Sequence, residues 1–200
     1  MIAASSVHTE IHCFSDASEK AYGTCVYFHS TDGNGEITVQ LLTSKSKVAP
    51  LKVQSLPRLE LCGAVLAAQL MEMVLEALTG QYKVHFWTDS TCVLQWIRAT
   101  PPTWNTFVAN RVSKIQTLTE GCSWRHVPGI SNPADLISRG VMPNALEGNS
   151  LWWEGPGWLK EGTDNWPKLV SIALEDAPEQ RRSFFEPQYT GFALLGFCSV

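Results

Sequence analysis

The sequence predicts an α/β fold with a mixed sheet, in the order strand, strand, strand, helix, strand, helix, helix, strand, helix (βββαβααβα). Three observations support this order. Three strand-like runs lie between residues 10 and 45, and the stretch from Leu56 to Leu78 has helical apolar spacing. A short buried strand at 84–89 then alternates with further helical segments, as in layered folds with helices packed on a sheet.

The first three strands are predicted to form an antiparallel meander. Their runs are EIHCFSD, AYGTCVYFHS and GEITVQLLTSK. The second and third are separated by TDGNG, whose D-G and N-G steps are strong hairpin signals.

The helices are bounded by capping and breaking residues. Ser55 is a candidate cap for the first helix, and Ser90 for the helix STCVLQWIRA, which Pro101 ends. Residues 104–120 form the next helix, residues 122–129 one more strand, and Pro133 begins a last short helix.

Length and composition predict one domain with an extension. A chain of 200 residues, 44% hydrophobic, buries one sizeable core. We place the domain at residues 9–145, followed by a Trp/Gly/Pro-rich C-terminal extension, residues 146–200. Residues 170–200 lack clear periodicity, and the extension is expected to be a linker.

The cysteines and apolar runs point to an intracellular protein. No two cysteines form a C-x-x-C pair, and most lie in apolar runs, so reduced buried thiols are expected rather than disulfides or zinc ligands. The closing run GFALLGFCSV is too short to cross a bilayer. The six cysteines are Cys13, Cys25, Cys62, Cys92, Cys122 and Cys198.

The net charge of −4 argues against a nucleic-acid partner until its distribution is considered. Residues 1–140 hold 11 Lys/Arg and 11 Asp/Glu, whereas residues 141–200 hold 4 and 8. If four acids of the first part bind metal, the remaining surface is mildly basic and suits a phosphate backbone, although weakly.

Four acidic residues stand at the ends of predicted elements: Asp16, Glu60, Asp89 and Asp135. Each alone fits a turn, a helix cap or a helix first turn. Together they suggest one site, because converging carboxylates repel unless a hard cation such as Mg²⁺ or Mn²⁺ neutralises them.

Strand order decides whether these acids meet. If the strands that end at Asp16 and Asp89 are parallel neighbours, roughly 4.8 Å apart, the two side chains can share a cation. Glu60 lies off the apolar stripe of its helix, where small residues permit close approach to the sheet. Those small residues are Gly63, Ala64 and Ala67.

Four motifs carry a resemblance to a known family: DASEKAYG, LPRLEL followed by GA, WTDSTCVLQWI, and HVPGISNPADLISRG. Together they resemble the ribonuclease H domain of BEL/Pao-type LTR retrotransposon polyproteins over about residues 10–166. SNPADLISRG and the run WW-x-GP-x-WL are specific to that group, and the resemblance implies a ribonuclease H-like fold.

The resemblance also implies an activity. In the family, an Asp-Glu-Asp-Asp set binds two Mg²⁺ ions, with Mn²⁺ as a substitute, and cleaves the RNA strand of an RNA–DNA hybrid. By motif that set is Asp16, Glu60, Asp89 and Asp135, with Asp16 bridging both ions. The implied partners are the hybrid and the reverse transcriptase domain of the same polyprotein. The isolated domain is expected to be monomeric, in a cytoplasmic virus-like particle or the nucleus.

Secondary contacts and departures complete the resemblance. Gly23, Ser18 and Ser90 are candidate substrate contacts. Many relatives place a histidine after the glycine that ends the last strand, whereas here Ile130 follows, and slower turnover is expected unless another group substitutes. His126 is interpreted as structural.

The element that helps some relatives grip the hybrid is also not evident, because the basic residues of the helices are scattered. Trp96 and Trp104 are expected in the core rather than stacked on bases.

Other functions were weighed against this one. A catalytically inactive or domesticated module that binds nucleic acid or protein stays open. An integrase or transposase usually draws its glutamate from a helix after the later strands, whereas Glu60 lies between the first two aspartates. Aspartic proteases need D-[ST]-G, and serine hydrolases of the α/β type need G-x-S-x-G; neither motif fits the chain.

Overall fold

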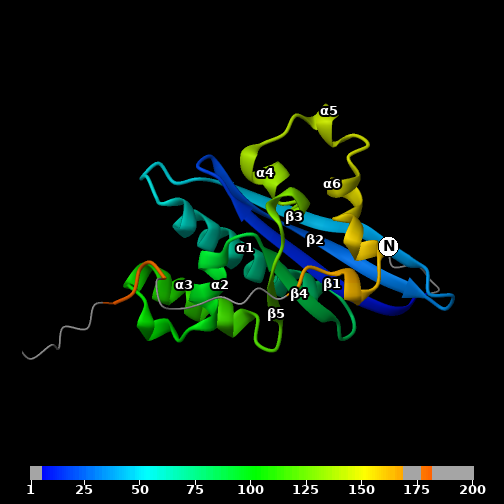
Figure 1. Ribbon diagram of the computed structural model, residues 1–200, viewed down its shortest axis with the longest axis horizontal. Helices are drawn as coiled ribbons and strands as arrows, with labels where there is room; N and C mark the ends of the chain where they lie inside the picture. Colours follow the sequence, from blue (N-terminus) through cyan, green and yellow to red (C-terminus); the bar gives the residue numbers. More distant parts are fainter. Residues whose placement is uncertain (1–5, 169–176, 182–200) are drawn as a thin grey trace, which may run out of the picture.

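A computed structural model describes residues 6–168 and 177–181. Its centre is a five-stranded sheet in the order β3-β2-β1-β4-β5 (Figure 1). The strands are β1 Ser6–Ala17, β2 Ala21–Asp32, β3 Ile37–Val48, β4 Lys83–Thr88 and β5 Ser123–His126.

Strand directions follow the predicted topology. β1 is antiparallel to β2, and β2 to β3, whereas β1 runs parallel to β4 and β4 to β5. Strand β1 is therefore central, with Ser15 paired with Thr88 of β4. The carboxyl ends of β1 and β4 consequently meet at the same edge of the sheet.

The helices cover the two faces of the sheet, with α1–α3 on one side and α4–α6 on the other (Figure 1). The predicted α/β order is confirmed over the described residues. The α-helices are α1 Leu56–Ala77, α2 Thr91–Arg98, α3 Thr106–Leu118, α4 Asp135–Arg139, α5 Pro143–Leu146 and α6 Ser150–Glu154. Short 3₁₀ turns are η1 Pro101–Thr103, η2 Gly129–Ser131, η3 Gly157–Lys160 and η4 Thr163–Asn165.

Local hydrogen bonds explain where elements turn and begin. In the β2–β3 hairpin, the Asp32 carboxylate accepts from the backbone N–H groups of Asn34 and Glu36 at 2.9 and 2.8 Å. The Ser90 hydroxyl accepts from the Val93 N–H at 3.2 Å and caps α2 as predicted. Ser55 occupies the N-cap position of α1 but makes no side-chain cap bond.

The α1–α3 face holds a continuous apolar core. Helix α1 packs Ala67 and Leu70 onto Ile11 and Val26 of the sheet. A second group joins α1 to α2 and α3, and Trp96 and Trp104 are fully buried in it, which confirms their predicted packing role. Its buried members are Leu61, Ala64, Val93, Trp96, Ile97, Trp104, Val108, Val112, Ile115 and Ala177.

The C-terminal extension packs onto the opposite face. Trp152, Leu159 and Trp166 are buried against Phe14 and Trp87 of the sheet. The packed unit therefore continues to residue 168, past the predicted end at 145, because this sheet face needs apolar cover that residues 146–168 supply. Most of the stretch 170–200, expected to be linker, lies outside the described residues.

Residues 177–181 return to the helical layer. Ala177 is buried among α1–α3, and the Trp96 indole N–H donates to the Pro178 carbonyl oxygen at 2.8 Å. The Glu179 carboxylate accepts from the Arg58 Nε at 2.7 Å and from the Asn105 side-chain amide at 3.1 Å. This segment is thus part of the fold.

Five cysteines fall in the described part of the chain, and all are free thiols. Cys13 and Cys25 are buried, Cys62, Cys92 and Cys122 are half-buried, and Cys198 lies outside the described residues. Among the described helices, none combines the length and apolar character needed to span a membrane.

Candidate active site

Asp16 and Asp89 lie side by side at the carboxyl ends of β1 and β4. Asp16 is the penultimate residue of β1, and Asp89 directly follows β4. The two carboxyl groups interact electrostatically, since the charge of Asp89 adds to the effect of burial in raising the pKa of Asp16. The parallel pairing expected from the sequence therefore brings two of the four predicted acids together.

Glu60 reaches the same edge from the first turns of α1. Gly63 lets the helix approach, since a Cβ atom there would lie 3.0 Å from the Asp16 carbonyl oxygen. Ala67 is also fully buried against the sheet, and Ala64 is fully buried among α1–α3. Burial raises the pKa of Glu60 against the hydrogen bond from Ser90, and the negative charge of Asp16 raises it further, so these two carboxylates interact.

Asp16, which is buried, and Glu60 and Asp89, which are half-buried, all have raised pKa values. Burial, reinforced by the charges of Asp89 and Asp135, raises the pKa of Asp16 to about 7, against the hydrogen bond from Ser138. Burial is also the first cause of the raised pKa values of Asp89 and Glu60. This donor set fits hard divalent cations, because a cation would relieve both the repulsion and the burial of these charges.

Asp135 stands apart from the other three in exposure. It begins α4, its side chain is about one third exposed, and it forms an ion pair with Arg139 one turn later. Its charge contributes, after burial, to the raised pKa of Asp16, so these two acids interact. Asp135 therefore lies beside the other three predicted acids, at the solvent rim.

The remaining predicted contacts have local partners. The Ser18 hydroxyl donates to the Ser138 carbonyl oxygen at 2.5 Å. A Cβ on Gly23 would lie 2.5 Å from the Ile137 Cδ1 atom, so α4 rather than a nucleic acid fills the space above this glycine. Gly23 also lies in regular pairing with Ser46, because the irregularity between β2 and β3 lies at Val26 and Tyr27.

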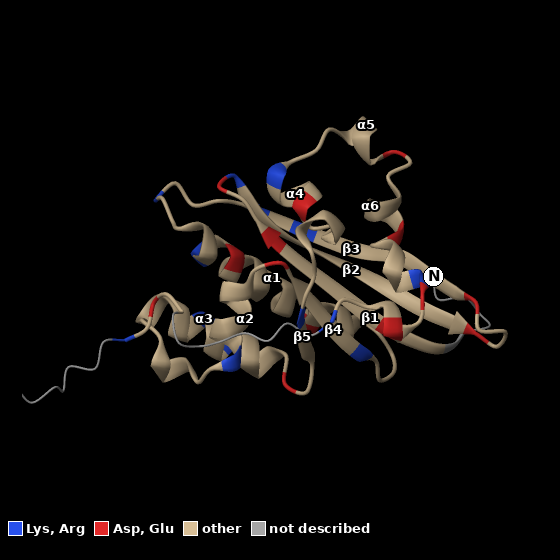
Figure 2. Ribbon diagram, in the orientation of Figure 1, with Lys and Arg blue, Asp and Glu red and all other residues tan. Residues whose placement is uncertain are grey.

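The loop after β5 carries no histidine beside the acids. Ile130 is 91% exposed, and Gly129 lies close to the site, where a Cβ would be 3.3 Å from Asp89 Oδ2. His126 ends β5. Lys and Arg residues are scattered along the ribbon rather than gathered on one element, as expected from the sequence (Figure 2).

Three buried polar residues next to the acids were not predicted as site residues in this role: Ser138, Asn132 and Ser90. Each donates a side-chain hydrogen bond to one acid, to Asp16, Asp89 and Glu60 respectively. Two of the three belong to the SNPADLISRG motif that also carries Asp135, and that proximity is the signal by which they were recognisable.

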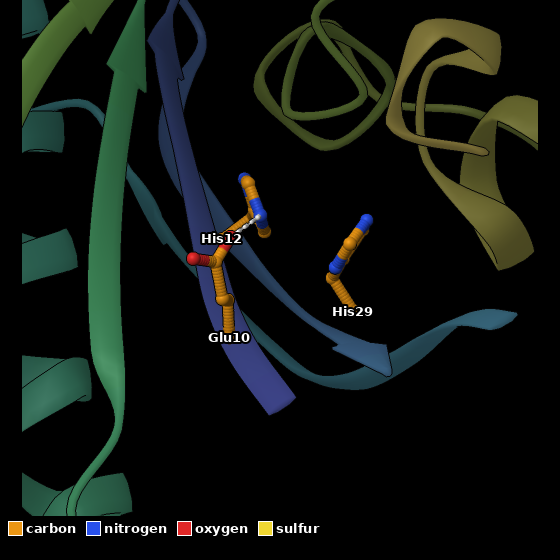
Figure 3. Close-up of side chains that lie close together, drawn as sticks. All are labelled: Glu10, His12 and His29. Carbon is orange, nitrogen blue, oxygen red and sulfur yellow. Dashed lines mark ion pairs between the residues drawn. The ribbon is translucent and has the colours of Figure 1, made fainter. Parts of the chain in front are cut away.

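A second cluster of titratable side chains, one glutamate and three histidines, lies nearer the start of β1. Glu10, His12 and His29 offer ligand atoms within 4.8 Å of one another (Figure 3), and His85 stacks on His12. We call these four residues the histidine cluster. The Trp87 indole N–H donates to His12 Nδ1 at 3.1 Å, so neutral His12 carries its proton on Nε2. His12 therefore offers no free lone pair to a metal while this bond is kept.

The comparisons with known proteins agree with the motifs. Residues 2–90 match the family described as Pao retrotransposon-like RNaseH-like domain. The resemblance to the Pao-type RNase H family is thereby confirmed. The matched segment contains Asp16, Glu60 and Asp89, whereas Asp135 lies beyond it. No curated protein matches the chain.

Solved structures resemble the chain at low identity. The N-terminal RNase H domain of Rv2228c from Mycobacterium tuberculosis is 14% identical with a TM-score of 0.46, covering 72% of this chain and 99% of that one. LC11-RNase H1 in complex with an RNA/DNA hybrid is 16% identical with a TM-score of 0.46, covering 69% and 99%. The protease-reverse transcriptase of prototype foamy virus is 13% identical with a TM-score of 0.33, covering 80% and 21%.

Proposed function

We propose that this RNase H-like domain is a metal-dependent endoribonuclease that cleaves the RNA strand of RNA–DNA hybrids during reverse transcription of a retroelement. The observation that carries the proposal is the placement of Asp16, Glu60 and Asp89, from three different elements, at one edge of the sheet, where burial raises the pKa of each. Such perturbed, converging acids are typical of functional sites. Two Mg²⁺ ions, or Mn²⁺, suit these oxygen ligands.

In this proposal, the metal ions and the acidic residues have separate roles in cleaving the phosphodiester. Bound divalent ions supply a nucleophilic hydroxide and stabilise the departing oxygen of the phosphodiester. Asp16, on the central strand, faces both Asp89 beside it and Asp135 at the rim, and so is suited to bridge two ions. Arg139 already pairs with Asp135 at the exposed edge, where a phosphate of the substrate would approach.

The partners follow from the same proposal. The substrate is an RNA–DNA hybrid, and a reverse transcriptase domain of the same polyprotein would hold it, because basic side chains on this domain are scattered (Figure 2). Weak binding of hybrid by the isolated domain is therefore expected. Action in a cytoplasmic particle or in the nucleus fits this function equally.

The test is cleavage of an end-labelled RNA–DNA hybrid by the purified chain with Mg²⁺ or Mn²⁺. We expect internal cuts in the RNA strand only, loss of cleavage with a chelator, and a loss of at least about 100-fold in Asp16→Asn, more than a supporting residue contributes. The matched control is Asp164→Asn, which removes an exposed acid in η4.

Two outcomes would contradict the proposal. Equal cleavage by the chain and by Asp16→Asn, or cleavage of single-stranded RNA without metal, would exclude this active site. Binding of hybrid without any cleavage in either metal would favour the inactive, nucleic-acid-binding alternative.

A further inference from the structure

Each of the three carboxylates, Asp16, Asp89 and Glu60, has its own buried hydrogen-bond donor. The three donors are at most 6% exposed, and none of them is an acid or a base. The pairs are Ser138 with Asp16, Asn132 with Asp89, and Ser90 with Glu60. Such a one-to-one arrangement is informative because buried polar side chains are ordered by the bonds they make.

Ser138 connects α4 to the central strand. Its hydroxyl donates to Asp16 Oδ2, and it is fully buried. Its carbonyl oxygen in turn accepts from the Ser18 hydroxyl at 2.5 Å, in the turn just after β1. The two bonds fix α4 against the strand end and give the Asp16 side chain one preferred rotation.

Asn132 joins three elements of the site. Its side-chain amide donates to the Ser15 carbonyl oxygen at 3.0 Å and to Asp89 Oδ1 at 3.4 Å. Its side-chain oxygen accepts from the Ala134 N–H at 3.2 Å, at the start of the helix that bears Asp135. One side chain that is 1% exposed thus ties together the ends of β1 and β4 and the start of α4.

Ser90 serves two purposes with one hydroxyl. It donates to Glu60 Oε2 at 2.6 Å and accepts from the Val93 N–H at 3.2 Å. The cap of α2 and the orientation of Glu60 are therefore coupled. Because Ser90 follows Asp89 directly, the turn at residues 89–90 carries Asp89 and also binds the Glu60 carboxylate.

We infer that Ser138, Asn132 and Ser90 are positioning residues that aim the three carboxylates at a shared cation site; this inference rests on the proposed function. Each donor engages one carboxylate oxygen and leaves the other for a cation. The oxygens left are Asp16 Oδ1, Asp89 Oδ2 and Glu60 Oε1. Hydrogen bonds from outer residues orient metal ligands in this way, and their loss typically weakens metal affinity or activity by about 10- to 100-fold.

The test measures metal binding apart from catalysis. Ser138→Ala, Asn132→Ala and Ser90→Ala are titrated with Mn²⁺ without substrate, and their thermal unfolding is recorded with and without the ion. We expect Mn²⁺ affinity to fall by about 10-fold or more in each. The control Ser131→Ala, in the same segment but outside these hydrogen bonds, keeps the affinity of the unchanged chain.

Kinetics with the hybrid separate positioning from substrate binding. We expect kcat to fall by about 10-fold while KM for the hybrid stays unchanged, since the three donors are at most 6% exposed and their side chains bond to the acids. Ser90→Thr keeps the hydroxyl and is expected to restore Mn²⁺ affinity, whereas Ser90→Ala does not. If Asn132→Ala does not fold, Ser138→Ala and the Ser90 pair decide the question.

The outcomes of the two proposals are distinguishable. Unchanged Mn²⁺ affinity in folded Ser138→Ala and Ser90→Ala, or no Mn²⁺ binding by the unchanged chain, overturns the positioning role. If the unchanged chain binds Mn²⁺ and the variants bind it weakly, positioning stands even when no hybrid is cleaved, and only the nuclease proposal fails.

Discussion

Two buried acids, Asp16 and Glu10, lie on one face of β1, yet their pKa values are shifted in opposite directions. At the carboxyl end, Asp16 has a raised pKa of about 7. Four residues from the start of the strand, Glu10 has a pKa well below its usual range, because His85, and then Lys83 and His8, outweigh burial. The difference lies in the neighbours: acids surround Asp16, whereas a lysine and histidines surround Glu10.

The contrast follows from where basic side chains lie: they contact Glu10 directly, whereas Asp16 has other acids around it. Lys83 Nζ lies 3.1 Å from Glu10 Oε1, and His85 Nε2 lies 3.6 Å from Glu10 Oε2. At the carboxylate site, the basic partner is Arg139, which pairs with Asp135 and not with the buried acids. The opposite directions of the two pKa shifts thus report the opposite charges that surround Asp16 and Glu10.

The largest expected effect concerns the cover of the histidine cluster. Trp166 is 5% exposed and packs edge-on against His12 and His85, with ring centroids 4.9 and 5.1 Å apart. We expect Trp166→Ala to lower the free energy of unfolding by about 3–5 kcal/mol, measured by urea denaturation. Trp153→Ala is the control, since Trp153 is 51% exposed, and an equal loss in both would show that Trp166 has no special role.

The next prediction sets the two acids against each other without metal. We expect Asp16→Asn to raise the free energy of unfolding at pH 8 by about 2 kcal/mol, because a buried, repelled charge is removed. Glu10→Gln should lower it by about 2 kcal/mol, because a charged hydrogen-bond acceptor is lost. Shifts of the same sign would remove the contrast.

Their pH windows follow from the same shifts. Asp16 has a folded pKa raised from 3.8 to about 7, so wild-type stability falls as pH rises between these values, and the gain of Asp16→Asn grows over the same window. Glu10 has a depressed folded pKa, so its contribution is present above its unfolded value of 4.5 and is lost as pH falls below it. Urea denaturation at pH 4, 6 and 8 distinguishes the two.

Metal binding should compete with the proton on Asp16. Because the Asp16 pKa is about 7, we expect Mn²⁺ affinity to fall by up to about 10-fold for each pH unit below that value. Calorimetric titrations between pH 6 and 8 measure this slope. A flat profile would mean that Asp16 is not a ligand, or that another group holds the proton.

The smallest effect is expected at His12. Burial, followed by the charges of His85 and His29, lowers the pKa of His12 well below 6.5, so the folded protein keeps it neutral while the unfolded chain takes up a proton. Stability contributed by neutral His12 is therefore lost as pH falls below 6.5. We expect His12→Asn to remove about 1 kcal/mol of this pH-dependent loss of stability between pH 6.5 and 5.5. The measurement is the unfolding midpoint, which should depend less steeply on pH in the variant.

Sequence reasoning predicted the elements better than the contacts between them. Ser90 and the hairpin glycine Gly35, which has a positive φ, act locally, so their roles were readable from neighbouring residues. The histidine cluster was missed, because it depends on strand register. His12 pairs with Tyr27 of β2 on one side and with His85 of β4 on the other. Alternating residues share a face, but which strand lies beside them is a tertiary property.

The active site shows the same difference between features that local sequence predicts and features that depend on tertiary contacts. Asp16 and Asp89 were predicted at strand ends, and their meeting required only that β1 and β4 be parallel neighbours. The donors Asn132 and Ser138 were not predicted, because they come from a segment more than 40 residues beyond Asp89. The packing of residues 146–168 was also missed, since Gly- and Pro-rich composition resembles a linker when the apolar sheet face it covers is unknown.

The five residues 177–181 bear on how this domain is to be produced. They supply the acceptor for the Trp96 indole and the acid that holds Arg58, two positions before Glu60. A recombinant protein trimmed at residue 168, where the sheet cover ends, would leave that indole without its acceptor inside the helical layer. Expression boundaries should therefore run beyond Arg181, and a protease that cuts between 168 and 177 would leave this peptide held by non-covalent contacts alone.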